Sequence, residues 1–257
     1  MIIAGIDMGI CNTKAAIMKD EKIIGRSAVP TGGIDRPQQA QKAYDEALKN
    51  AGIAAGDVER VVSTGKGKFD VAFASEHYTE TVAAARAAQY ALPGATAVMS
   101  AGADETLSAA LGTTRLIDEF VLNQKCSAGI GAFLEYLGAR LELTLEQISN
   151  CDGPDAGEMN EGCVVFSELD ALSLLNAGAA PEAVMSTANR AAATRAATVL
   201  ADLTASPGGN VVLIGGLAKN AAFVKALEAR LGRSFTIPED AEYCGAIGAA
   251  LCSVKGI

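Results

Sequence analysis

Three short segments at the start of the chain are rich in apolar residues, and glycine or polar residues separate them: residues 2–9, 12–19 and 22–29. Short apolar runs that are bounded by turn residues are typical of β-strands. The pattern therefore predicts three strands joined by tight turns.

The next segments alternate between helix and strand. Residues 37–52 have helical spacing that ends at Gly52, with three apolar residues on one side: Ala43, Ala47 and Leu48. Residues 60–69 predict a short strand that runs into a glycine-rich loop, and residues 75–91 predict an alanine-rich helix. Residues 92–95 contain proline and glycine, so we expect a turn there.

The pattern of the first strands restarts after this turn. Residues 96–104 predict a strand that ends in glycine and an acid, and residues 105–111 and 115–123 predict two further strands. The order strand, glycine turn, strand, strand therefore occurs twice, which indicates a structural repeat. No linker separates the halves, so we expect an α/β fold of two closely packed lobes.

The remaining segments are mainly helical. Residues 126–141 and 163–175 each begin with a cysteine, and residues 181–205 predict a long alanine-rich helix. Residues 208–220 predict a strand, a Gly-Gly turn and a helix start. Residues 243–251 predict a closing helix of small residues.

Composition and charge exclude several classes of function. The chain has 257 residues, half of them hydrophobic, and a net charge of −9, which argues against nucleic acid as the main partner. No apolar run has the length of a membrane span, and the start lacks the layout of a signal peptide. We therefore expect a cytoplasmic protein whose six cysteines are not paired in structural disulfides.

The turn between the first two strands has residues that suit a phosphate group. Gly9 lets the backbone approach a phosphate closely, and backbone N–H groups there can bind its oxygens. Asp7 could hold a metal-bound water, Lys14 could neutralise phosphate charge, and Thr13 lies in the same motif. An ordinary hairpin with a surface lysine is the alternative interpretation.

Two further glycine turns resemble the first. Gly102, Asp104 and Glu105 occupy the matching turn of the second repeat, where the acids could bind a metal or could be solvated turn residues. Gly215 and Gly216 follow a strand and could bring the backbone, with the nearby Asn220, against the base or ribose of a ligand. Three such turns in one repeated α/β chain favour nucleotide binding.

Cys126 and Cys163 each stand just before a predicted helix. A helix N-terminus stabilises an anion, and thiolates and the iron–sulfur clusters that they bind are anions. A four-iron cluster normally requires four thiolates, so two copies of the chain or two related subunits would supply them. A buried structural role is expected for the other cysteines: Cys11, Cys151, Cys244 and Cys252. We assign no role to His77.

Several motifs together resemble the activator family of 2-hydroxyacyl-CoA dehydratases and the ATPase subunits of benzoyl-CoA reductase. They are GIDMG…TK, STGKGK, NQKCSAGIGAFLEYLGARL, GCVVFSELDALSLL, VVLIGGLAKN and YCGAIGAAL, in family order over nearly the whole chain. The resemblance implies two ribonuclease H-like lobes of the actin–hexokinase–chaperone ATPase fold around a nucleotide cleft. The lobes would comprise residues 1–93 plus 241–257 and residues 94–240.

The resemblance also implies an activity and its cofactors. ATP with Mg²⁺ would bind in the cleft, with Asp7 and Glu105 as catalytic residues. One [4Fe-4S] cluster would be shared across a dimer, with Cys126 and Cys163 as ligands in each subunit. ATP hydrolysis would change the angle between the cysteine helices and drive an electron at very low potential, supplied by reduced ferredoxin or flavodoxin. The acceptor would be a larger iron–sulfur subunit that acts on an acyl-CoA thioester.

The chain departs from the family pattern in its phosphate motifs. Ile10 and Cys11 replace the usual Ser-Thr, and SAGADE, residues 100–105, replaces the usual Asp-Ile-Gly-Gly-Gln-Asp. We therefore expect weakened hydrolysis or a more active sister subunit, which favours a reductase-type ATPase subunit over a free-standing activator. A small-molecule kinase of the same fold and a non-catalytic partner that supports assembly remain alternatives.

Overall fold

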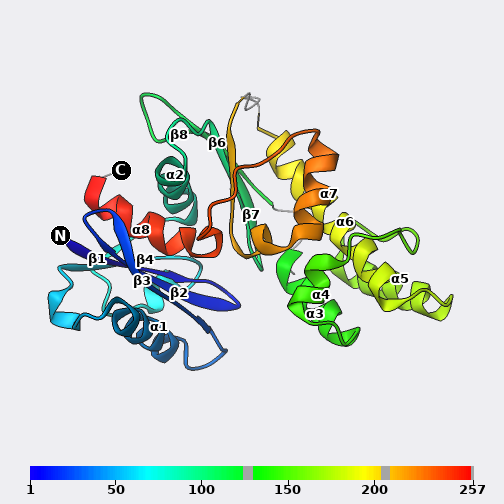
Figure 1. Cartoon of the computed structure of the whole chain (residues 1–257), viewed down its shortest axis with the longest axis horizontal. Coiled ribbons are helices and arrows are strands. Elements are labelled where there is room, and N and C mark those ends of the chain that lie inside the picture. The colour runs from blue at the N-terminus through cyan, green and yellow to red at the C-terminus, as the bar shows by residue number, and fades with distance from the viewer. Residues whose placement is uncertain (124–129, 204–208, 256–257) are drawn as a thin grey trace.

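The structure is a computed structural model that describes residues 1–123, 130–203 and 209–255. Two mixed β-sheets lie side by side, and helices cover their faces (Figure 1). The described helices include none that is long and apolar enough to cross a membrane. The architecture is the α/β fold that the repeated pattern predicts.

The first sheet has the strand order β3-β2-β1-β4-β5. Its strands are β1 (Ile2–Met8), β2 (Asn12–Lys19), β3 (Lys22–Pro30), β4 (Arg60–Thr64) and β5 (Glu76–His77). β1, β2 and β3 are antiparallel, whereas β4 runs parallel to β1 and β5 parallel to β4. Because β1 and β4 are parallel, both end at the same edge of the sheet.

Two helices cover the first sheet. α1 (Arg36–Ala51) packs on β2 and β3, and Gly52 ends it in the left-handed conformation that glycine adopts without strain. α8 (Cys244–Lys255) packs on β1, β2 and β4. Gly5 of β1 faces the backbone of Ala246 so closely that a Cβ would overlap it. The small residues of the closing segment therefore allow close helix–sheet contact.

The second sheet has the strand order β8-β7-β6-β9. Its strands are β6 (Ala97–Ala101), β7 (Thr106–Leu111), β8 (Ile117–Leu122) and β9 (Val211–Ile214). β6 and β7 are antiparallel, and β9 runs parallel to β6 as β4 does to β1. Thr236 adds a parallel bridge to Val212, in the place that β5 occupies in the first sheet. The two sheets thus repeat one topology.

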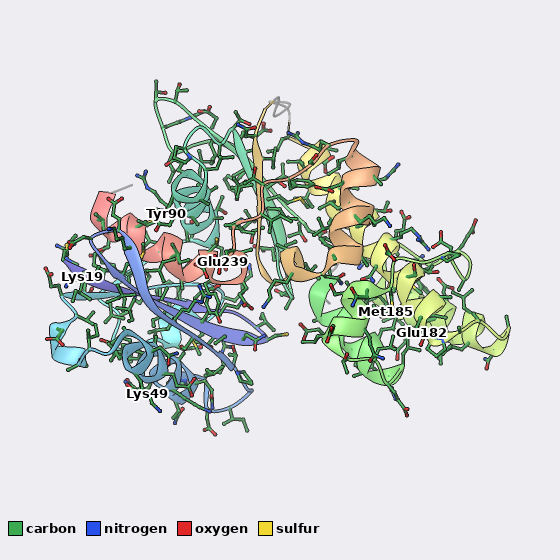
Figure 2. The ribbon with its side chains drawn as sticks, viewed as in Figure 1. Lys19, Lys49, Tyr90, Glu182, Met185 and Glu239 are labelled. Carbon is green, nitrogen blue, oxygen red and sulfur yellow. The ribbon has the colours of Figure 1, made fainter. Side chains whose placement is uncertain are left out.

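The outer part of the second lobe is helical (Figure 1). Its helices are α3 (Ile130–Arg140), α4 (Leu145–Asn150), α5 (Val164–Asn176), α6 (Pro181–Ala201) and α7 (Ala221–Leu231). α6 is central to this group and contacts α3, α4, α5 and α7. Its Met185 is fully buried in the core of the lobe (Figure 2).

α2 (Glu80–Ala91) lies against both α8 and the second sheet. Ala83 packs in the core that includes α8, whereas Ala84, Ala87 and Ala88 pack on strands β6, β7 and β9. The packing of α8 on the first sheet supports a first lobe of residues 1–93 plus 241–257, which we retain as a proposal. In that division α2 belongs to the first lobe and contacts both.

The structure corrects the predicted helix at residues 75–91. Glu76 and His77 pair with Val62 and Ser63 as strand β5, so the helix begins only at Glu80. Thr79 caps it by accepting a hydrogen bond from the backbone N–H of Val82. His77 is therefore a strand residue, and its Nδ1 lies 2.7 Å from Oγ of Ser63.

Candidate functional site

A cavity of about 660 Å³ lies between the two sheets. Its volume is in the range of small-molecule sites, roughly 300–1,000 Å³. The loops at the carboxyl ends of β1, β4, β6 and β9 contribute to its wall, together with residues of α3 and α4. Nine of the candidate site residues singled out from the sequence line it: Asp7, Gly9, Lys14, Gly102, Asp104, Glu105, Gly215, Gly216 and Asn220.

Asp7 is held at the edge of the first sheet by its strand neighbours. It is paired with Lys14 across the antiparallel ladder and with Thr64 across the parallel one. Burial raises the pKa of the Asp7 carboxyl, the charge of Lys14 opposes the rise, and the charge of Glu80 adds to it. A carboxylate that is poorly solvated in this way gains much from a metal cation.

Two glycines make room for the Asp7 carboxylate. Gly65, with φ +89°, follows β4, and a Cβ there would lie 2.7 Å from Oδ1 of Asp7 and 2.5 Å from the carbonyl oxygen of Met8. Gly245 lies against Oδ2 of Asp7 just as closely, at the start of α8. Gly245 belongs to the motif YCGAIGAAL, but nothing in the sequence placed it beside Asp7, because the two residues lie at opposite ends of the chain.

Thr64 carries a buried hydroxyl that has no hydrogen-bond partner among the described residues. The residue is 1% exposed, lines the cavity, and its Oγ1 has no partner in the described part of the chain. An unpaired buried hydroxyl is costly. Together with the carboxylate of Asp7 it offers the oxygen ligands that Mg²⁺ prefers, so these residues fit a magnesium–phosphate group.

Thr13, which belongs to the same predicted motif, does not line the cavity. It is fully buried, and its Oγ1 lies 2.9 Å from Oγ1 of Thr31. Thr31 donates its hydroxyl proton to the carbonyl oxygen of Gly9 at 2.9 Å, so Thr13 is the donor to Thr31. Thr13 therefore stabilises the turn at Gly9 indirectly, through Thr31. The sequence pattern gives no sign of this role for Thr31.

The turn after β6 has the same backbone geometry as the turn after β1. Gly9 donates its backbone N–H to the carbonyl oxygen of Asn12 at 3.2 Å, and Gly102 donates to that of Glu105 at 3.0 Å. Asn12 and Glu105 are therefore structural equivalents. Counting back from the glycines, Ser100 occupies the position of Asp7.

Glu105 forms an ion pair across the cavity. Its Oε2 accepts a hydrogen bond from Nζ of Lys66 at 2.7 Å. Lys66 lies in the loop after β4, within the STGKGK motif, and also lies 3.5 Å from Oε1 of Glu80. The predicted catalytic residues Asp7 and Glu105 thus line one cavity from different sheets, and the side chain of Lys66 contacts Glu105.

The other side of the cavity is formed by Gly215, Asn220 and the short helix α4. Gly215 has φ +96°, and Asn220 caps α7 by accepting a hydrogen bond from the N–H of Phe223 at 3.0 Å. Asn220 also donates to Oδ1 of the buried Asn189, which donates to the carbonyl oxygens of Ile148 and Cys151 at the end of α4. Neither α4 nor this buried amide pair follows from the sequence pattern.

The charge of the cavity wall bears on its ligand. Two aspartates and five glutamates line it, against three lysines: Lys14, Lys66 and Lys219. A polyphosphate alone would meet net repulsion from such a wall. A divalent cation bound to the phosphates would reverse that balance, so the wall fits a metal-bound nucleotide better than a free one.

The cysteines divide into two groups. Cys163 is half-buried and forms the N-cap of α5, and its backbone N–H donates to Oδ1 of Asn160 at 2.7 Å. Cys126 lies outside the described residues. Burial raises the pKa of Cys244 to about 12 and that of Cys252 to about 11, which keeps both thiols protonated.

The remaining two cysteines differ from each other in their surroundings, and only Cys11 departs from the expected buried role. Cys151 closes α4 and is buried, although it follows a polar stretch. Cys11 is half-buried and lines the cavity instead of lying in the core. Within the part of the chain that the structure describes, no group of three or more His, Cys, Asp or Glu residues is arranged to hold a metal ion.

Comparison with known proteins agrees with this geometry. The model of the BadF/BadG/BcrA/BcrD ATPase family matches residues 4–253. The activator of lactoyl-CoA dehydratase from Anaerotignum propionicum is 31% identical over 258 residues, which cover 98% of this chain and 96% of that protein. A benzoyl-CoA reductase component from Thauera aromatica is 28% identical over 271 residues, which cover 97% and 92%.

A solved structure supports the same assignment. The activator of 2-hydroxyisocaproyl-CoA dehydratase from Clostridium difficile, with bound ADPNP, matches with a TM-score of 0.88 and 25% identity. The match covers 98% of this chain and 93% of that one. The fold and family that the motifs predicted are therefore confirmed: the chain belongs to the BadF/BadG/BcrA/BcrD ATPase family and has its two-lobed, actin-like ATPase fold.

Proposed function

We propose that this protein is an ATP-dependent electron-transfer subunit that delivers low-potential electrons to an acyl-CoA reductase or dehydratase. The observation that carries the proposal is the cavity between the lobes, where Asp7, Lys14 and Thr64 meet at adjoining strand ends. Relatives over nearly the whole chain are named as an activator of lactoyl-CoA dehydratase and as a component of benzoyl-CoA reductase.

The residues around the cavity suit ATP and Mg²⁺. Asp7 and the hydroxyl of Thr64 would hold the cation, and Lys14 would pair with phosphate oxygens. Backbone N–H groups beside Gly9 and Gly102 would bind the phosphates, and Gly215, Gly216 and Asn220 would border the nucleoside. Glu105 would orient the attacking water from the second lobe.

A [4Fe-4S] cluster bridging two subunits would supply one-electron chemistry at low potential. Cys163 fits a ligand to such a group, because it is half-buried at the N-terminus of α5. Asn160 fixes the backbone before it by accepting hydrogen bonds from the N–H groups of Gly162 and Cys163. Cys126 remains the second proposed ligand.

The surface next to Cys163 suits a partner subunit. Four apolar residues on α5 are more than half exposed: Val165, Phe166, Leu169 and Leu172. Their spacing puts most of them on one side of the helix, and α5 lies at the outer end of the second lobe, away from the first sheet (Figure 1). An exposed apolar face of this kind marks an interaction surface, so it supports a homodimer or a pair of related ATPase subunits.

Two forms of the function remain to be distinguished. The altered phosphate motifs favour an ATPase subunit of a benzoyl-CoA reductase-type complex, which would work as one of an unlike pair. The 31% identity to a dehydratase activator favours a free-standing homodimer. In either form reduced ferredoxin or flavodoxin would be the donor. The five described cysteines are free, which accords with the expected cytoplasmic location.

The test is iron and acid-labile sulfide per chain in strictly anaerobic protein, with EPR after dithionite reduction and ATP hydrolysis with Mg²⁺. We expect about two irons per chain and a reducible cluster signal, since one four-iron cluster would serve two chains. The oligomeric state of the isolated chain separates the two forms, because only the free-standing activator would form a cluster-containing homodimer alone.

Cys163→Ala is expected to abolish the iron content, whereas Cys151→Ala, at a buried cysteine in the same lobe, is expected to retain it. Iron-free wild-type protein after anaerobic cluster reconstitution, both alone and with a related subunit, would rule out the electron-transfer proposal. Equal iron in both variants would exclude Cys163 as a ligand.

A further inference from the structure

Lys66 joins the two lobes across the cavity. It lies in the loop after β4 of the first sheet, and its Nζ is 2.7 Å from Oε2 of Glu105 in the turn after β6 of the second. The same Nζ is 3.5 Å from Oε1 of Glu80, the first residue of α2. One ammonium group therefore bridges carboxylates from two other elements.

The surroundings keep Lys66 charged but able to change partners. Burial lowers its pKa, but the hydrogen bond and charge of Glu105, with the charge of Glu80, outweigh burial and leave the pKa raised. The side chain of Lys66 is 39% exposed and that of Glu105 is 22% exposed. Part-exposed ion pairs are weak, so a stronger anion in the cavity can displace one partner.

The loops after β4 and β9 place equivalent backbone positions, Lys66 and Gly216, at the cavity. Lys68 donates its N–H to the carbonyl oxygen of Gly65, and Ala218 donates to that of Gly215, both at 3.2 Å. Gly216 is thus the structural equivalent of Lys66, and it also lines the cavity, with open space where a Cβ would stand. The first lobe places a long cationic side chain where the second has none.

We propose that Lys66 is a phosphate-binding and positioning residue that exchanges partners when a nucleoside triphosphate enters. Without nucleotide it holds Glu105 across the cavity. With the terminal phosphate bound, its ammonium group binds phosphate oxygens, and the Glu105 carboxylate is left to face the accompanying Mg²⁺ and its waters. This inference rests on the proposed nucleotide site and adds a role that depends on the third phosphate.

A glutamate at position 105 supplies the reach that this exchange requires. An aspartate would end one methylene group earlier, and the 2.7 Å contact with Nζ of Lys66 would open. This chain has glutamate at position 105, where the family motif ends in aspartate, and the longer side chain allows the contact with Lys66.

The test measures binding of ADP and of β,γ-imido ATP, each with Mg²⁺, by titration calorimetry on the full chain. Lys66→Met is expected to weaken binding of the imido analogue about tenfold, as loss of a charge-assisted hydrogen bond would, and to leave ADP binding nearly unchanged. Lys66→Arg is expected to retain most of the affinity for the analogue. Lys49→Met is the matched control, since Lys49 is exposed on α1 at the outer side of the first lobe (Figure 2).

A second measurement tests the exchange itself. Without Mg²⁺, Glu105→Gln is expected to tighten binding of the analogue, because it frees Lys66 to bind phosphate. This gain in affinity should be roughly two- to fivefold larger in the protein that has Lys66 than in the protein that already carries Lys66→Met. Equal effects in the two backgrounds would show that the pair does not exchange. Analogue and ADP affinities that respond equally to Lys66→Met, or not at all, would overturn the role of Lys66. Absence of nucleotide binding by the wild-type chain would overturn the proposed site as well.

Discussion

The turns after β1 and β6 have the same backbone hydrogen bond, but different side chains surround them. In the first lobe Asp7 has Lys14 and Thr64 as its strand neighbours, and all three are polar. In the second lobe the equivalent Ser100 has Leu107 and Ile214 as its neighbours. The repeat therefore preserves the backbone that would position a phosphate site, but only the first copy has charged groups at these strand positions. We infer that the first lobe binds the cation and that the second contributes mainly backbone and Glu105.

The largest expected difference between the two turns is in ATP hydrolysis. Asp7→Asn should lower the steady-state ATPase rate on the order of 100-fold, because the amide cannot replace the carboxylate that would hold the cation. Ser100→Ala, at the equivalent position, should change the rate by no more than about twofold. Equal losses in the two variants would contradict the asymmetry.

The backbone, in contrast, should respond alike in both lobes. Gly65 and Gly215 have φ of +89° and +96°, and a Cβ at either would overlap the strand that precedes its lobe's first turn. Gly65→Ala and Gly215→Ala should each lower the free energy of unfolding by about 1–3 kcal/mol in urea titrations. Gly216→Ala, which meets open space, should be tolerated. A loss confined to one lobe would show that the loops are not equivalent.

Thr64 and Ile214 occupy equivalent strand positions, and a smaller difference in nucleotide affinity is expected when each is replaced by valine. Thr64→Val should weaken Mg²⁺–nucleotide binding about tenfold while leaving the free protein as stable or more stable, because it removes an unpaired buried hydroxyl. Ile214→Val should cost about 0.5–1.5 kcal/mol of stability with little change in affinity. Calorimetric titration and urea unfolding measure both quantities. Unchanged nucleotide affinity in Thr64→Val would exclude its hydroxyl from the site.

The smallest expected effect is on the pH dependence of stability. Burial raises the pKa of Asp7 in the folded protein above its ordinary value of 3.8. In the pH window between the ordinary and the raised pKa, the folded state therefore retains a proton that the unfolded state has released. Stability of the nucleotide-free protein should therefore fall as pH rises through the window, and Asp7→Asn should flatten the slope. Urea unfolding from about pH 4 to about pH 7 measures this, with Ser100→Ala expected to keep the wild-type slope.

The sequence pattern was sufficient for elements that local rules decide. The strands at Ile2–Met8, Asn12–Lys19 and Lys22–Pro30 follow their short apolar runs, and the first helix ends at Gly52 as its helical spacing predicts. The repeat and the glycine turns were also visible, because turn residues and strand order are local signals. These signals are enough to identify the glycine turns that form part of the cavity wall.

Tertiary contacts decided the rest. Residues 75–79 have a helical pattern, but Glu76 and His77 pair with β4 as a strand, because β4 offers them a free edge, and the helix begins only after the cap Thr79. Gly245 beside Asp7 and Asn189 beside Asn220 are far from their partners in sequence, so no local period could reveal them. The contact of Lys66 with Glu105 likewise exists only because two lobes bring their loops together. The two glycine turns could be predicted from sequence alone, because backbone sterics make glycine a local signal for a tight turn. The charge pairs across the cavity could not, because they depend on distances that only the packed lobes set.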